Sequence, residues 1–130
     1  MNTLLPVVAL AAALTASTAG AHHSFAAEYD QNRPVKLTGT VTRFDLANPH
    51  SWIHIDVKDP NGQVVNWAFE TASVSNLFRR GIKKDTVKAD MVVTIEGYQA
   101  RDATHTGNAQ RLTMPDGMVL VLGSETNPGE

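Results

Sequence analysis

Polar and apolar residues alternate along most of the chain after residue 34. This period of two is typical of β-strands that face a core on one side and solvent on the other. The alternating stretches cover residues 35–42, 51–57, 65–70 and 91–96. Two further apolar stretches, 109–114 and 118–122, flank a Pro-Asp-Gly turn. The pattern therefore predicts five or six short strands.

Turn residues and a change of period predict how these strands are connected. Asn48-Pro49 ends the first strand, and Asp59-Pro60-Asn61-Gly62 joins the second and third strands as a hairpin. A short helix is expected after the third strand, capped by Thr71 or Ser73 and ended by Gly81. Its apolar face comprises residues three and four positions apart: Val74, Leu77 and Phe78.

This order of elements predicts a mainly β fold. We expect a small, partly open, five- to six-stranded barrel of the oligonucleotide/oligosaccharide-binding (OB) type, with the short helix between strands three and four. A β-sandwich is the alternative, and the helix in mid-chain counts against it. The predicted barrel covers residues 35–123, an irregular arm covers residues 22–34, and a disordered tail covers residues 124–130.

Residues 1–21 have the features of a secretory signal peptide. The apolar run from Leu4 to Leu14 is shorter than the roughly 20 residues that span a bilayer. Ala19-Gly20-Ala21 matches the small-residue pattern of a cleavage site, although a cut after Gly20 is also open. A buried N-terminal helix is the alternative. We therefore predict a secreted, periplasmic protein that has no membrane span after processing.

Composition narrows the classes of function. The chain has 130 residues, enough for one domain, and its formal net charge is -2. A nucleic-acid partner is not expected, because binding to phosphates needs a basic patch. The absence of cysteine excludes disulfides and zinc-thiolate sites. We find no nucleophile motif and no phosphate-binding glycine loop, so we expect a protein that is not an enzyme.

The N-terminal histidine pair carries the first candidate chemistry. Cleavage after Ala21 would make His22 the first residue, so that its α-amino and ring nitrogens could chelate one ion. That arrangement is called a histidine brace when a third imidazole completes it, and such a nitrogen-rich site suits Cu(II). Cleavage after Gly20 would instead place His23 third, and an Xaa-Xaa-His terminus also chelates copper or nickel. Both cuts predict copper as the cofactor.

The third imidazole could come from His50 or His54. These residues share one face of the predicted second strand about 13 Å apart, so one ion would not bind both. His50 follows a turn and can face the arm, which makes His22, His23 and His50 the predicted metal ligands. The plainer alternatives are an irregular His-His arm and a His50 side chain that only bonds its own turn.

A second candidate site is the outer face of the second and third predicted strands, the usual ligand groove of this barrel type. Its predicted ligand contacts are Trp52, His54 and Arg101, with the loop residues His105 and Asn108 beside them. A small polar ligand or another periplasmic protein could bind there without any metal. Trp52 could instead pack under the arm, against Phe25 or Tyr29.

The chain also resembles an uncharacterised family of small secreted bacterial proteins. The resemblance rests on "HHSFAAEYD", "LTGTVTRFDLANPHSWIHIDVKD", "NWAFE", "LFRRGI" and "VTIEGYQARD". Mature chains of that family begin near His-His-Ser-Phe and carry an Asn-Pro-His-x-Trp segment. The resemblance implies that residues 22–25, 48–50 and Trp52 occupy the family's recognisable positions, and that His54 and His105 do not. It implies no particular activity, partner or oligomeric state.

Overall fold

The structure is a computed structural model that describes residues 25–124. The predicted signal peptide, His22, His23 and residues 125–130 of the predicted tail lie outside the described residues. The elements in chain order are α1 (Phe25–Glu28), β1 (Tyr29–Asp45), β2 (Trp52–Lys58), β3 (Val64–Glu70), α2 (Val74–Arg79), β4 (Val92–Ala100), β5 (Thr106–Thr113) and β6 (Val119–Val121).

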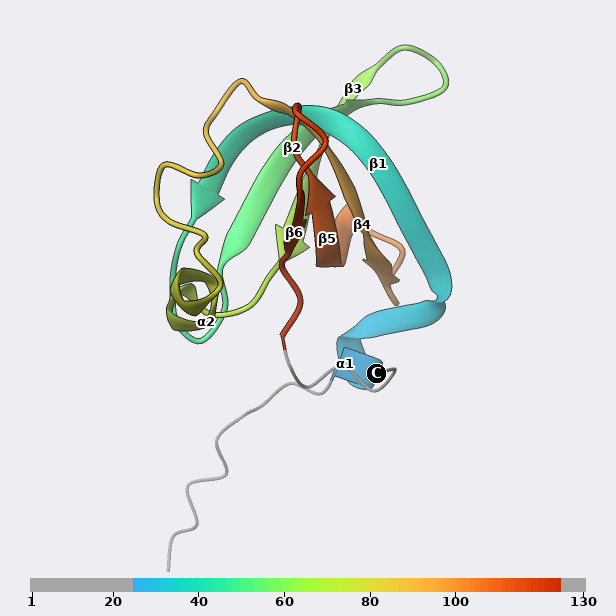
Figure 1. The fold of residues 1–130 in the computed structure, drawn as a ribbon. Helices are drawn as coiled ribbons and strands as arrows, with labels where there is room; N and C mark the ends of the chain where they lie inside the picture. Colours follow the sequence, from blue (N-terminus) through green and yellow to red (C-terminus); the bar gives the residue numbers. More distant parts are fainter. Residues whose placement is uncertain (1–24, 125–130) are drawn as a thin grey trace, which may run out of the picture.

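The six strands form one curved sheet in the order β3-β2-β1-β4-β5-β6 (Figure 1). The long strand β1 lies at its centre and pairs with both β2 and β4 in antiparallel fashion. A short parallel pairing of β3 with β5, from Ala68–Thr106 to Glu70–Asn108, joins the two sides of the sheet. This closure, with α2 between β3 and β4, confirms the predicted OB-type barrel.

Side chains from alternate strand positions fill the barrel. The largest fully buried apolar side chains are Phe69, Ile53, Ile55, Leu77, Ile82, Ile95, Leu112, Leu122, Val41 and Val93. They include the inward positions that the alternating pattern predicted in the four main strands. Each full burial of such a side chain contributes about 1.5–3 kcal/mol, so the barrel core is the main source of stability in a chain without disulfides.

The short helix α2 was predicted correctly in its place but not in its packing. Ser73 caps it, because the Ser73 hydroxyl accepts a hydrogen bond from the backbone N–H of Asn76 at 3.1 Å. Leu77 is fully buried, but Phe78 is 52% exposed, although it was predicted to share the apolar face. The helix has six residues, and Leu77 is the one among them that is buried.

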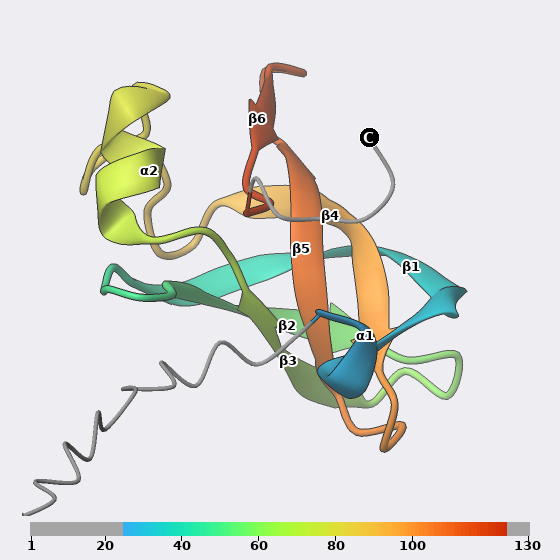
Figure 2. The same ribbon diagram turned by 90° about the horizontal axis from the view of Figure 1, so that it is seen from below.

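The N-terminal boundary of the barrel differs from the prediction. Residues 25–28 form α1, and β1 begins at Tyr29 rather than at residue 35. The pairing with β4 shifts register between Tyr29 and Pro34, so residues in this part do not alternate and the pattern is lost. Figure 2 shows α1 and the first part of β1 lying beside the ends of β4 and β5.

Aromatic packing holds this N-terminal part in place. The ring of Phe25 lies 5.6 Å from that of Tyr29 and 5.6 Å from that of Tyr98 in β4, the second in an edge-to-face arrangement.

Between residues 25 and 124, neither helix is long and apolar enough to cross a membrane.

Candidate functional site

A buried carboxylate joins two of the regions that the sequence analysis treated separately. Glu70, the last residue of β3, has an 8% exposed surface. One of its oxygens accepts a hydrogen bond from the hydroxyl of Tyr29, at the start of β1. Its other oxygen lies 3.1 Å from Nδ1 of His50. We call these three residues the Tyr29–Glu70–His50 cluster.

The chain on either side of His50 is fixed by its neighbour Ser51. The Ser51 side chain is fully buried, and its hydroxyl oxygen accepts a hydrogen bond from the N–H of Ala47 at 3.0 Å. The Ser51 backbone N–H donates to Ala72, and its carbonyl accepts from Thr71 at 2.8 Å. The turn that contains Asn48-Pro49, whose peptide bond is cis, is thereby tied to the end of β3, so His50 lies beside Glu70.

Burial and charge shape the titration of Tyr29. Burial raises the pKa of the Tyr29 phenol far above its usual range, and the hydrogen bond to Glu70 and the charges of Glu70 and Glu28 raise it further. Tyr29 therefore stays a neutral hydrogen-bond donor at every physiological pH. A buried carboxylate needs such donors, and Glu70 has one on each oxygen.

The contact with Glu70 also determines which nitrogen of His50 is available. When Nδ1 carries the proton and donates it to Glu70, the lone pair on Nε2 is open to another partner. The His50 side chain is 38% exposed, so that partner can arrive from outside. A carboxylate bound to one ring nitrogen is also the usual support of a histidine that ligates a metal through the other.

A pocket of about 460 Å³ lies next to this cluster. It is lined by residues of α1, the starts of β1, β2 and β5, the end of β4 and the β4–β5 loop: Ala27, Glu28, Tyr29, Trp52, Ala100, Arg101, Asp102, Thr104 and Thr106. Tyr29 belongs to both the pocket and the cluster. Trp52 lies directly opposite Glu70 in the β2–β3 pairing.

The rim of the pocket is held by local hydrogen bonds. Nε of Arg101 donates to the carbonyl of Ala26 at 2.6 Å, which ties the β4–β5 loop to α1. Asp102 accepts hydrogen bonds from the N–H and the hydroxyl of Thr104. These bonds lower the pKa of the Asp102 carboxyl, which favours the charged form.

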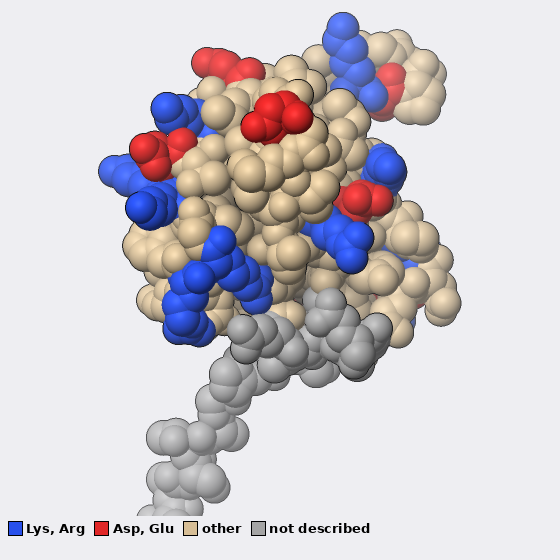
Figure 3. All heavy atoms as spheres, in the orientation of Figure 1, with Lys and Arg blue, Asp and Glu red and all other residues tan. Residues whose placement is uncertain are grey.

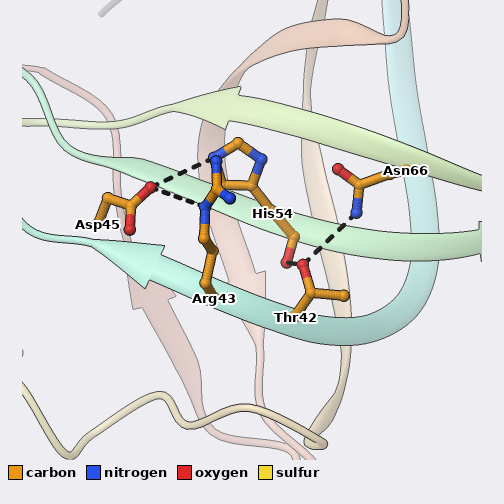
Figure 4. A network of polar contacts seen from close by, with 5 residues as sticks. All are labelled: Thr42, Arg43, Asp45, His54 and Asn66. Atoms are coloured by element: carbon orange, nitrogen blue, oxygen red, sulfur yellow. Dashed lines mark hydrogen bonds and ion pairs between the residues drawn. The ribbon is translucent and has the colours of Figure 1, made fainter.

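His54 belongs to a different network, on the outer face of β1 and β2 (Figure 4). Its Nε2 lies 3.3 Å from Nη2 of Arg43 and 3.6 Å from a carboxylate oxygen of Asp45. Arg43 and Asp45 also pair with each other at 2.9 Å. The Asn66 amide and the Thr42 hydroxyl continue the network along the strands.

The structure thus divides the predicted groove. Trp52 and Arg101 line one pocket, and His54 does not line it; ligand binding by any of the three stays a prediction. Asn108 is buried and bonds the side chain of Gln110, so its predicted place in the groove is wrong. His105 is exposed, with its ring 5.2 Å from that of Trp67. Trp52 shares its pocket with α1 and Tyr29 of the expected arm.

Sequence reasoning missed Glu70 and Tyr29 as parts of the site. Glu70 stands on the same alternation as Asn66 and Ala68, which predicts an exposed face, and nothing local shows that Tyr29 covers it. Glu70 directly follows the buried Phe69 in β3, and its place opposite Trp52 is seen only in the strand register. Residues 25–124 contain no group of three or more His, Cys, Asp or Glu side chains that could hold a metal ion.

Fold and site together define a small OB-type barrel with a histidine–carboxylate–tyrosine cluster beside an open pocket. The chain belongs to a family of unknown function, DUF6152, whose model matches residues 9–110. This match confirms the expected membership of an uncharacterised family. The matched range includes both the N-terminal histidine pair and His50.

Among solved structures, a mitochondrial single-stranded-DNA-binding protein from S. cerevisiae is similar, with 12% sequence identity and a TM-score of 0.47. The similarity covers 69% of this chain and 95% of that one. No curated protein matches the chain.

Proposed function

We propose that the processed protein is a periplasmic, non-enzymatic copper-binding protein. Signal peptidase would release residues 1–21, and the amino group and ring of His22 would bind Cu(II) together with Nε2 of His50. With cleavage after Gly20, His23 would take part in an Xaa-Xaa-His chelate instead. Storage, delivery and sensing of copper are all compatible with such a site.

The contact between His50 and Glu70 is the observation that carries the proposal. It occupies Nδ1 of His50 at 3.1 Å and leaves Nε2 as the lone-pair donor. Imidazole nitrogen is a preferred ligand of copper, and an outer carboxylate raises the basicity of the ligating ring. Tyr29 bonds the other carboxylate oxygen, so the Glu70 side chain that contacts His50 is itself held in place.

Chain connectivity makes the third ligand reachable. Glu70 connects His50 to Tyr29, and the ring of Phe25 packs on that of Tyr29 at 5.6 Å. His22 precedes Phe25 by three residues, a stretch that can span about 10 Å when extended. Because these contacts link Phe25 to His50, we expect an N-terminus released at this point to reach His50.

The proposal is tested by titrating Cu(II) into the processed protein in the presence of a competing chelator. Isothermal titration calorimetry measures the affinity. The matched variants are a chain with one extra N-terminal residue, His50→Ala, and His54→Ala as control. We expect the first two to bind copper at least tenfold more weakly and the control to match the wild type. Equal affinity in all four proteins would contradict a site built from the N-terminus and His50.

The pocket supports a second candidate function, a metal-free binding module for a small ligand. Its volume of about 460 Å³ lies in the range of small-molecule sites. Trp52 and Tyr29 offer aromatic surface, and Arg101 offers a cation beside the carboxylates of Glu28 and Asp102, a combination that suits a polar ligand with an aromatic part.

Anilinonaphthalene sulfonate, an aromatic anion, is a suitable probe for this second candidate. We expect its fluorescence to rise on binding to the metal-free protein, and Arg101→Ala and Trp52→Ala to abolish the rise. Binding that survives both substitutions would place the probe elsewhere and remove the support for this function.

A further inference from the structure

The charges of the chain are unevenly distributed. Residues 79–90 contain five basic residues and two acidic ones, a formal net charge of +3, in a chain whose total is -2. The other residues together therefore carry a formal charge of -5. Figure 3 shows Lys and Arg gathered over α2 and the loop that follows it. We call residues 78–90 the basic platform.

The basic platform is anchored to the barrel. Ile82 and Val87 are 1% and 3% exposed, so the loop is pinned to the core at two points. Its turn is closed by the N–H of Lys83, which donates to the Thr86 hydroxyl at 2.8 Å. At its end, the N–H of Asp90 donates to Val41 in β1 at 2.8 Å. The outward residues are thus held on a defined surface.

One side of the basic platform is tied to β6. Nη1 of Arg80 donates to the carbonyl of Gly123 at 2.6 Å and to that of Val121 at 3.2 Å. Arg80 therefore has a structural role, and the cations directed to solvent are those of Arg79, Lys83, Lys84 and Lys88, all of which are exposed.

A large apolar side chain stands among these cations. Phe78 is 52% exposed, although it is the last but one residue of α2 and follows the buried Leu77. Single exposed apolar side chains are common on protein surfaces, and Phe78 differs from the others in having several cations in the same segment. Lysine and arginine beside an exposed aromatic ring are the composition of surfaces that lie on anionic membranes.

We propose that the basic platform binds the surface of an anionic phospholipid bilayer. The phenyl ring of Phe78 enters the boundary between headgroups and acyl chains, and Arg79, Lys83 and Lys84 contact the headgroup phosphates. This inference is independent of copper binding, because the platform shares no residue with the Tyr29–Glu70–His50 cluster or the pocket.

A bilayer fits this surface better than a nucleic acid. Platforms for single strands stack successive bases on several aromatic rings, and residues 78–90 contain one aromatic residue, Phe78. A single ring surrounded by cations matches the interfacial anchoring of a peripheral protein.

Flotation of the processed, full protein with lipid vesicles tests the proposal. Vesicles of phosphatidylcholine alone are compared with vesicles that also contain phosphatidylglycerol. We expect binding only to the second kind, weakened by high salt because the attraction is electrostatic. The double variant Lys83→Gln/Lys84→Gln should bind about thirtyfold more weakly, and Phe78→Ser about tenfold more weakly.

The β2–β3 hairpin provides the matched control. Lys58 is exposed there opposite Val64, which is 60% exposed, so the pair also combines a cation with an exposed apolar side chain but lies outside the platform. Lys58→Gln and Val64→Ser should leave vesicle binding unchanged. Equal losses in the control and platform variants would overturn the proposal. So would equal binding to both kinds of vesicle, or tighter binding to a single-stranded oligonucleotide than to the vesicles.

Discussion

At the scale of the residue, Glu70 connects more of the candidate site than any other side chain. It holds His50 on one oxygen and Tyr29 on the other, and it does so from a position that is 8% exposed. Burying a charged carboxylate is costly unless donors surround it. Removing either donor, or the carboxylate itself, therefore has consequences that can be measured.

The first prediction concerns Tyr29 and pH. The pKa of the Tyr29 phenol is raised by burial and by Glu70 in the folded state, whereas it is about 10 in the unfolded chain. The contribution of the Tyr29 phenol to the free energy of unfolding is therefore complete below about pH 10 and decreases as the pH rises further. Tyr29→Phe should lose about 1–3 kcal/mol of unfolding free energy near neutral pH. This deficit relative to the wild type should shrink at higher pH.

Urea unfolding of both proteins between about pH 8 and pH 11 measures this difference directly, since the reference phenol titrates within that range. A deficit that stays constant over the whole range would show that the Tyr29 hydroxyl does not stay protonated in the folded state.

The second prediction concerns Glu70 and copper. Glu70→Gln keeps the shape of the side chain but removes the charge that supports the His50 ring. Losing an outer carboxylate costs about 10–100-fold in metal affinity. Asp45→Asn is the control, because Asp45 also lies beside a histidine, 3.6 Å from Nε2 of His54, which is not a proposed ligand. Copper affinity that falls equally in both variants, or in neither, would contradict the role given to Glu70.

At the scale of the element, strands β4 and β5 approach each other most closely at Gly97. The register between them shifts at this residue, and a Cβ added there would lie 1.9 Å from the carbonyl oxygen of Asn108. The backbone cannot yield at that distance, so only glycine fits. The need for glycine at position 97 comes from packing, and the alternating pattern of β4 does not indicate it.

Gly97→Ala should therefore destabilise the barrel by about 3 kcal/mol or more, since the contact is with backbone rather than with a flexible side chain. Glu96→Ala, one residue earlier on the exposed face, should change stability by less than about 1 kcal/mol. Thermal unfolding followed by circular dichroism compares the two. Similar melting temperatures for both variants would show that the strands can separate at Gly97 without loss.

The elements also show which parts of the fold the sequence pattern can predict. Strands β2, β3 and β4 were predicted from alternation because each has one face in the core and one in solvent. The first part of β1 was not, because its register shift breaks the alternation between Tyr29 and Pro34. Phe78 was placed inside for a similar reason: helical spacing shows which residues share a face, not how wide that face is when packed.

At the scale of the whole molecule, closure of the barrel brings together residues that are far apart in sequence. The pairing of β3 with β5 and of β1 with β4 sets Tyr29, Trp52 and Arg101 around one pocket. The sequence singled out His50 as a candidate ligand because it follows a turn. It singled out Trp52 and Arg101 because they fall in the usual ligand groove of the fold. Tyr29 and Glu70 could not be singled out in this way, since their contact spans 41 positions and depends on the register shift in β1.

The proposed copper site and the proposed membrane surface use different parts of the barrel. The Tyr29–Glu70–His50 cluster lies at the meeting of β1, β2 and β3, and the basic platform follows α2. The cluster and the platform share no residue, so variants of one can be tested while the other is left unchanged.

The most direct test of the copper proposal is to identify the ligands by pulsed electron paramagnetic resonance. The Cu(II) complex of the protein that begins at His22 should show coupling to the remote nitrogens of two imidazole rings, and His50→Ala should show one. His54→Ala should match the wild type. Identical spectra for the wild type and His50→Ala would show that the copper ligands do not include His50, and the central claim would fail.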